Sequence, residues 1–282
     1  MNLDNIRIVA DSSADVTKLT DISFSYAPLK IITAQKEYVD DNSLDVLSMV
    51  NDLKDYKGKS STSCPNASDW LNAFGDAEWV FCVTITATLS GSYNSAMLAK
   101  SIYEEEHPGR RVFVLNSLSA GPQIALAIDR LRELILAGKD FDNIGDEISE
   151  YAIQRTGLVF MLESMKNLAN NGRVSPLVAG IAGILGIRVI GKASDKGDLE
   201  PLDKCRGEKR SLDAIVDRMV SLGFSGGKVR IAHCFNESAA KKLVELIEAK
   251  FDNAYIESYH CRGLCSFYAE TGGILVGFEK DM

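Results

Sequence analysis

The first half of the chain alternates short apolar runs with helical patterns, and this alternation constrains the fold most strongly. Residues 6–11 (IRIVAD), 78–85 (EWVFCVTI) and 111–116 (RVFVLN) are rich in apolar and β-branched residues, which is typical of buried strands. Amphipathic patterns follow the second and third runs, and the longest predicts a helix over residues 122–137. Strands that alternate with helices predict parallel βαβ units in an open sheet. The run 27–33 (APLKIIT) predicts a further strand.

The second half is organised differently and predicts a second domain. Residues 176–191 (PLVAGIAGILGIRVIG) predict a buried helix that runs into a strand, and a turn at 195–198 predicts a hairpin. Strands and helices follow without regular alternation. We therefore expect an α/β protein of two domains: an N-terminal parallel-sheet α/β domain over residues 1–150 and a C-terminal mixed α/β domain over residues 151–282. The polar segment 138–147 is the predicted connection.

Charge and hydropathy exclude several classes of protein. The formal net charge of -8 disfavours nucleic-acid binding, which needs a basic excess. The run 176–191 is shorter than the ~20 residues of a membrane span and contains Arg188. The N-terminal residues lack a signal-peptide pattern, and six cysteines are too few for a disulfide scaffold, so we expect a cytoplasmic location.

Hydroxyl-rich loops predict where a ligand binds. The segments 11–15 (DSSAD), 86–92 (TATLSGS) and 116–121 (NSLSAG) follow predicted strands, and 59–65 (KSSTSCP) precedes a predicted helix. In an open parallel sheet such loops gather at the carboxyl ends of the strands. Hydroxyls and the free amides of helix N-termini can together hold an anion. The alternative is that each hydroxyl merely caps its own helix.

The absence of nucleotide-binding motifs limits the classes of ligand that the sequence predicts. Neither GxGxxG nor GxxxxGK[ST] occurs, which favours a carboxylate or single phosphate over a nucleotide. A hydrolase or phosphotransferase acting on a small anion at the same site is the alternative function, with Ser95 and His260 as a conceivable pair. No nucleophile elbow supports it. The group of His260, Cys261 and Cys265 lacks the ligand spacing of a metal site, so no metal or other cofactor is expected.

Several short motifs together resemble the DegV family. They are VADSSAD (9–15), TSCP (62–65), LSGSYNSA (89–96), NGRVS (171–175) and PLDKCRGEKR (201–210), in family order over essentially the whole chain. The resemblance implies a two-domain α/β protein that carries a long-chain fatty acid as ligand between its domains and performs no chemistry itself. It implies that the bound acid is presented to a separate fatty-acid kinase and that the acyl phosphate then enters phospholipid synthesis.

The resemblance also implies roles for individual residues. Thr62 and Ser63 are implied contacts of the head group, together with one hydroxyl of 89–96, for which Ser95 is our prediction and Ser90 and Ser92 are the neighbouring candidates. Arg173 corresponds to the basic residue near the pocket mouth. Tyr268 stands where the family usually has a histidine, and it can donate a hydrogen bond without becoming cationic. The residues implied to dock the kinase are Arg206, Lys209 and Arg210.

A fatty acid also requires an apolar tunnel. Each buried methylene contributes roughly 0.8 kcal/mol, so the tail dominates affinity and the hydroxyls decide orientation. The segment 176–187 is the predicted lining, because its glycines and alanines leave room between large aliphatic residues. The alternative is that these small residues only let a helix approach a sheet. Contact with a membrane is expected to be transient at most.

Overall fold

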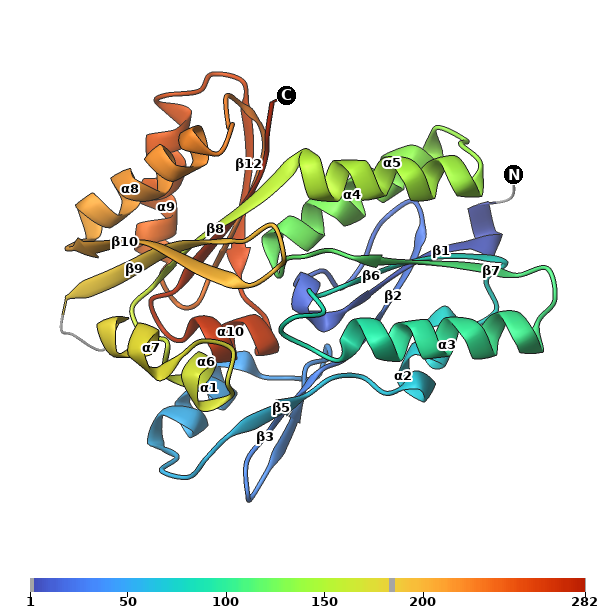
Figure 1. The fold of residues 1–282 in the computed structure, drawn as a ribbon, viewed down its shortest axis with the longest axis horizontal. Coiled ribbons are helices and arrows are strands. Elements are labelled where there is room, and N and C mark those ends of the chain that lie inside the picture. The colour runs from blue at the N-terminus through green and yellow to red at the C-terminus, as the bar shows by residue number, and fades with distance from the viewer. Residues whose placement is uncertain (1–2, 183–185, 282) are drawn as a thin grey trace.

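The computed structural model describes residues 3–182 and 186–281 and confirms the predicted α/β fold (Figure 1). The four strands of the first sheet are all parallel, in the order β2-β1-β6-β7. Their bounds are Ser23–Ala27, Ile6–Asp11, Trp79–Thr84 and Arg111–Asn116. Short 3-10 turns, Leu3–Asn5 and Ser12–Ala14, flank β1.

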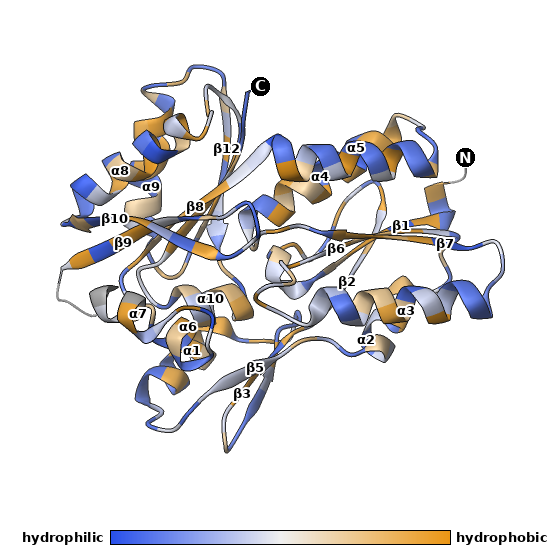
Figure 2. Cartoon of the chain, viewed as in Figure 1, coloured by the Kyte–Doolittle hydropathy of each residue, from blue (hydrophilic) through white to orange (hydrophobic). Residues whose placement is uncertain are grey.

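Alternating side chains bury both faces of this sheet. Ile8 and Phe81 pack with helices α4 (Pro122–Leu136) and α5 (Phe141–Gln154), whereas Val9 and Val80 pack with α2 (Ala67–Phe74) and α3 (Ser92–Glu106). Figure 2 shows the resulting orange, hydrophobic strands β1, β6 and β7. Strands buried on both faces read as continuous apolar runs, which is why the sequence predicted them.

The second sheet has six strands in the order β10-β9-β8-β13-β11-β12. Only β11 and β12 are a parallel pair, so the predicted mixed character is confirmed, as is the β9–β10 hairpin. Helices α8 (Glu208–Ser221) and α9 (Glu237–Glu248) pack on one face. The strands span Leu199–Arg206, Ile187–Ala193, Thr156–Leu162, Ile274–Glu279, Gly227–His233 and Ala254–His260, in the order of the sheet.

A third, antiparallel sheet was not predicted. It has the order β4-β3-β5, with bounds Glu37–Val39, Lys30–Ile32 and Ser61–Ser63. Helices α1 (Val46–Asp55) and α10 (Gly263–Ala269) pack against it through Met49 and Phe267. The predicted strand at 27–33 is therefore β3 of this small sheet, and part of the predicted loop 59–65 is strand β5.

The predicted connection at 138–147 is wrong, because most of it belongs to α5. Asp140 caps this helix by accepting a hydrogen bond from Asn143 N, and Phe141, Ile144 and Ile148 form its buried side. The polar residues that suggested a linker lie between these buried positions. Helix α4 packs against strands of both large sheets, and the division into residues 1–150 and 151–282 stays a prediction.

Two short helices complete the fold, α6 (Lys166–Asn170) and α7 (Pro176–Ala182). The prediction of a buried helix is wrong at the start of α7, where Leu177 is 84% exposed. Residues 183–185 of the predicted lining lie outside the described residues, so that lining stays a prediction. Within 3–182 and 186–281, no helix combines the length and the apolarity of a membrane span.

Candidate functional site

A cavity of about 270 Å³ lies between the two halves of the chain. This volume is close to the lower end of the about 300 to 1,000 Å³ of small-molecule sites. Its wall is mainly apolar and takes residues from the second and third sheets and from the loops that follow strands of the first sheet. Six of these are Leu29, Ile85, Leu89, Phe160, Leu162 and Leu275. We call it the apolar cavity, and its position agrees with the predicted ligand site between the halves.

The polar groups of this cavity are few. Its wall includes Thr62, Ser63, Ser90, Arg173 and Tyr268, all of which the sequence singled out. The oxygens of Thr62 and Tyr268 lie 2.7 Å apart, although they are 206 residues apart in the chain. An apolar cavity with a few polar groups suits a ligand with a long apolar body and one polar end.

Strand β5 places Thr62 and Ser63 at the cavity. Thr62 is opposite Ile31 in the antiparallel register with β3. Neither hydroxyl is needed as a helix cap, because the Asn66 side chain caps α2 by accepting from Asp69 N, and Asn66 N donates in return to the Asp69 carboxylate. The capping alternative is therefore wrong for Thr62 and Ser63.

Of the three candidates in 89–96, only Ser90 lines the cavity. Its hydroxyl accepts a hydrogen bond from Ser92 N at 3.2 Å. The structure differs from the prediction at Ser92, whose hydroxyl donates to the buried Asp11 at 2.6 Å. It differs also at Ser95, which lies in the first turn of α3 and is absent from the cavity wall. Sequence spacing does not reveal which side of a helix start faces a cavity.

Arg173 joins the two halves beside the cavity. Its Nε donates to the carbonyl oxygen of Leu89 at 3.1 Å, and its guanidinium carbon lies 5.9 Å from the centre of the Tyr268 ring. Gly172 before it has φ +73°, a conformation that favours glycine and turns the chain after α6. Arg173 is the one cationic side chain in the wall as far as the described residues form it.

Tyr268 provides a neutral hydroxyl at the site. Burial raises the pKa of its phenol, and this outweighs the opposing effects of the Thr62 hydrogen bond and the Arg173 charge. The group therefore keeps its proton near neutral pH. It can donate to a carboxylate, as the sequence analysis expected of the residue at this position.

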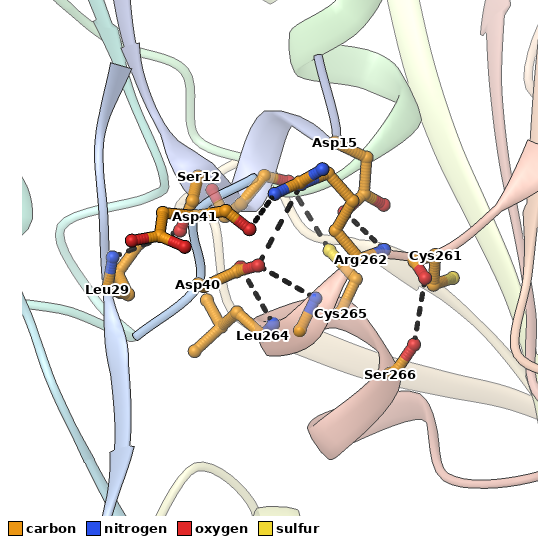
Figure 3. Close-up of polar contacts among 12 residues, drawn as sticks. Ser12, Asp15, Leu29, Asp40, Asp41, Cys261, Arg262, Leu264, Cys265 and Ser266 are labelled. Atoms are coloured by element: carbon orange, nitrogen blue, oxygen red, sulfur yellow. Dashed lines mark hydrogen bonds and ion pairs between the residues drawn. The ribbon is translucent and has the colours of Figure 1, made fainter. Parts of the chain in front are cut away.

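Helix α10, which carries Tyr268, is held by buried carboxylates (Figure 3). Asp40 accepts hydrogen bonds from Gly263 N and Leu264 N, each at 2.9 Å, and Asp15 accepts from Arg262 N at 2.9 Å. Burial raises the pKa of Asp40, and it raises the pKa of Asp15 to about 8, with repulsion from Asp40 adding to the shift. Neither helix α10 nor the role of these two aspartates was predicted from the sequence. The apolar spacing of Leu264 and Phe267 was the available signal.

The hydroxyls of the other two loops do not reach the cavity. Ser12 accepts from Leu29 N at 3.0 Å, and Ser117 donates to the carbonyl oxygen of Ser119 at 3.1 Å. From the loop 116–121, Ala120 contributes to the wall. Of the four hydroxyl-rich loops, 59–65 and 86–92 therefore bring hydroxyls to the cavity wall, and binding of an anion there stays a prediction.

The predicted docking residues lie away from the cavity. Arg206 ends β10, and Lys209 and Arg210 are in the first turn of α8. All three side chains are exposed, and none makes an ion pair with another described residue. They leave an unneutralised cationic patch, which we call the basic patch.

The geometry gives no support to a catalytic pair. No hydrogen bond joins Ser95 to His260 in the described part of the chain, and neither residue lines the cavity. His260 instead lies beside His233, with ring centres 4.2 Å apart and the rings tilted by 57°. Among residues 3–182 and 186–281, no group of His, Cys, Asp or Glu has the arrangement of a metal site, and all six cysteines are free thiols.

Comparison with known proteins identifies the family. The model described as "Uncharacterised protein, DegV family" matches residues 5–281. A DegV domain-containing protein of Streptococcus pneumoniae is 42% identical over 279 residues, which is 98% of this chain and 99% of that protein.

Two crystal structures have the same fold and cover 98% of this chain and all of their own. One is a DegV family protein from Eubacterium eligens loaded with heptadecanoic acid, with a TM-score of 0.96 and 44% identity. The other is the fatty acid kinase (Fak) B3 protein of Streptococcus pneumoniae loaded with linoleic acid, with a TM-score of 0.96 and 42% identity. This chain belongs to the DegV family.

Proposed function

We propose that the protein binds one long-chain fatty acid, with the acyl chain in the apolar cavity and the carboxylate at its polar end. The observation that carries this proposal is one cavity with an aliphatic wall and a small group of hydroxyls beside Arg173. The two solved relatives at 44% and 42% identity carry fatty acids. Burying about fifteen methylenes offers ~12 kcal/mol before ordering costs, so the tail supplies the affinity.

Within the site, Thr62, Ser63 and Ser90 are the proposed hydroxyl contacts of the carboxylate. Tyr268 supplies a further neutral donor, and Arg173 provides the positive charge nearby. We propose no contact for Ser92, whose hydroxyl is already bonded to Asp11, and none for Ser95. No nucleophile–base pair occurs among the described residues of the cavity wall, so a carrier fits the site better than the hydrolase or phosphotransferase alternative.

Extraction of the purified protein tests this function. Protein denatured in organic solvent is expected to release close to one equivalent of long-chain fatty acid, measured by mass spectrometry. An empty protein that also fails to take up heptadecanoic acid, together with hydrolysis of a phosphate ester, would favour the enzyme alternative.

The carrier role extends to a kinase partner. The solved relative named as a fatty acid kinase B protein supports the proposal that this protein presents its acid to a separate fatty-acid kinase in the cytoplasm, for phospholipid synthesis. The exposed basic patch of Arg206, Lys209 and Arg210 is the proposed docking surface. The exposed Leu177 is where we place a transient contact with membrane lipid.

Charge reversal tests the docking surface. The double variant Arg206→Glu/Arg210→Glu is expected to lower the rate of acyl phosphate formation by the kinase at least tenfold, because two favourable long-range attractions become repulsions. Its fatty-acid content should be unchanged, and the rate should depend less on salt. Lys241→Glu, an exposed charge reversal on α9, is the matched control. Loss of lipid in the double variant would instead place these arginines at the pocket.

A further inference from the structure

A second, polar cavity of about 210 Å³ lies beside the apolar one. Its wall includes Ser117, Gln123, Thr156, Lys192, Asp195 and Lys280. We call it the polar cavity. Leu158 is in the wall of both cavities and is only 3% exposed, so this side chain lies at the boundary between them.

Strand β8 runs from one cavity into the other. Thr156 lines the polar cavity, Leu158 lines both, and Phe160 and Leu162 line the apolar cavity. These residues share one face of the strand because side chains alternate, so they follow one another at about 7 Å intervals. The loop after β7 runs in the same order, with Ser117 at the polar cavity and Ala120 at the apolar one.

The head-group residues lie at the opposite end of this row. Arg173 N donates to the carbonyl oxygen of Leu168 at 2.8 Å, and Leu168 packs in one cluster with Leu162 and Tyr268. Leu158 is not in that cluster. An acyl chain that starts at the hydroxyls and follows β8 therefore meets Leu158 last.

The polar cavity is unsuited to a hydrocarbon. The amide oxygen of Gln123 is buried without a protein hydrogen-bond partner, while its nitrogen donates to Thr156 Oγ1 at 2.9 Å. Two lysines, Lys192 and Lys280, are also in its wall. Burial lowers the pKa of Lys280, and the Lys192 charge adds to this. A methylene placed here would exclude water from groups that need it, which opposes entry strongly.

We propose that Leu158 is the residue against which the methyl end of the bound fatty acid stops, so that it sets the longest chain the protein accepts. The inference rests on the proposed function and adds the residue that determines chain length. Leucine has three more carbons than alanine. Leu158→Ala therefore opens room for up to about three ligand carbons, and each methylene accommodated strengthens binding about fourfold.

The test is competition among a homologous series of saturated fatty acids for the delipidated protein, with the bound set quantified by mass spectrometry. The wild type is expected to show a sharp upper limit of length. Leu158→Ala should move that limit up by two or three carbons, and Leu158→Phe should move it down. Val159→Ala is the matched control, because Val159 is equally buried but packs with the core on the other face of the second sheet.

The outcomes separate this inference from the proposed function. A wild type that binds no member of the series overturns the proposed function. A wild type with an upper limit that neither Leu158 variant moves overturns the role of Leu158 and leaves the function standing. An equal shift in Val159→Ala would also overturn it, because loosening of the sheet would then be the cause. If the Leu158→Ala variant does not fold, the Leu158→Phe variant alone tests the inference, through the expected decrease in the upper limit of chain length.

Discussion

Replacing Asp11 with alanine is expected to lower the free energy of unfolding by about 4 kcal/mol. The Asp11 carboxyl group is fully buried and accepts from Ile85 N at 2.8 Å, from Ser92 Oγ at 2.6 Å, and from the amide and hydroxyl of Ser13. It ties the end of β1 to the end of β6 and to the start of α3. Alanine leaves these donors buried and without a partner, and each such donor costs about 1 to 3 kcal/mol.

Urea unfolding followed by circular dichroism measures this loss. Asp11→Asn should lower the free energy of unfolding less, because the amide oxygen of asparagine can still accept hydrogen bonds. Asp140→Ala is a matched control: Asp140 also caps a helix but is exposed, so its removal should cost only about 1 kcal/mol. Equal losses for Asp11→Ala and Asp140→Ala would show that the buried network does not brace the loops.

Removing two hydroxyls at the polar end should weaken fatty-acid binding on the order of 100-fold. The variant is Thr62→Ala/Ser90→Ala, and the reason is that a hydrogen bond to a charged group contributes about 1.5 to 3 kcal/mol. The fold should be retained, because both side chains are only partly buried and the hydroxyl of each makes one hydrogen bond within the protein. Calorimetric titration of delipidated protein with heptadecanoic acid measures the loss.

The matched control removes the hydroxyl of Ser95, which lies outside the cavity wall, in place of that of Ser90. In the Thr62→Ala/Ser95→Ala variant only the Thr62 contact is lost, so fatty-acid binding should weaken on the order of tenfold. If both double variants bind equally, Ser90 is not a head-group contact. If the Thr62→Ala/Ser90→Ala variant binds as tightly as the wild type, the carboxylate lies elsewhere.

Local sequence patterns were sufficient to predict the elements whose apolar pattern is long or continuous. The strands β1, β6 and β7 were found because both of their faces are buried, and α4 because its helical pattern runs for four turns. Strand β3 lies within a predicted strand, whereas β4 and β5 were missed because each has three residues, too few for a period to show. Helix α5 was missed because its many polar residues resemble a linker.

The candidate site, too, was only partly predictable from the sequence. The motifs pointed to Thr62, Ser63, Ser90, Arg173 and Tyr268, and all five lie in the cavity wall. They could not separate Ser90 from Ser95, because five residues of chain can place a hydroxyl on either side of a helix start. Nor could they find Asp40, whose role depends on Gly263 and Leu264, more than 220 positions away.

The sequence by itself determined the fold class, the family and the hydroxyls that a ligand could meet, because these depend on local periodicity and on short motifs. The tertiary structure alone decided which hydroxyls face a common space, how buried carboxylates hold α10, and that Leu158 separates an apolar cavity from a polar one. The physical reason is that a cavity is formed by side chains from distant segments, and its shape depends on how those segments pack.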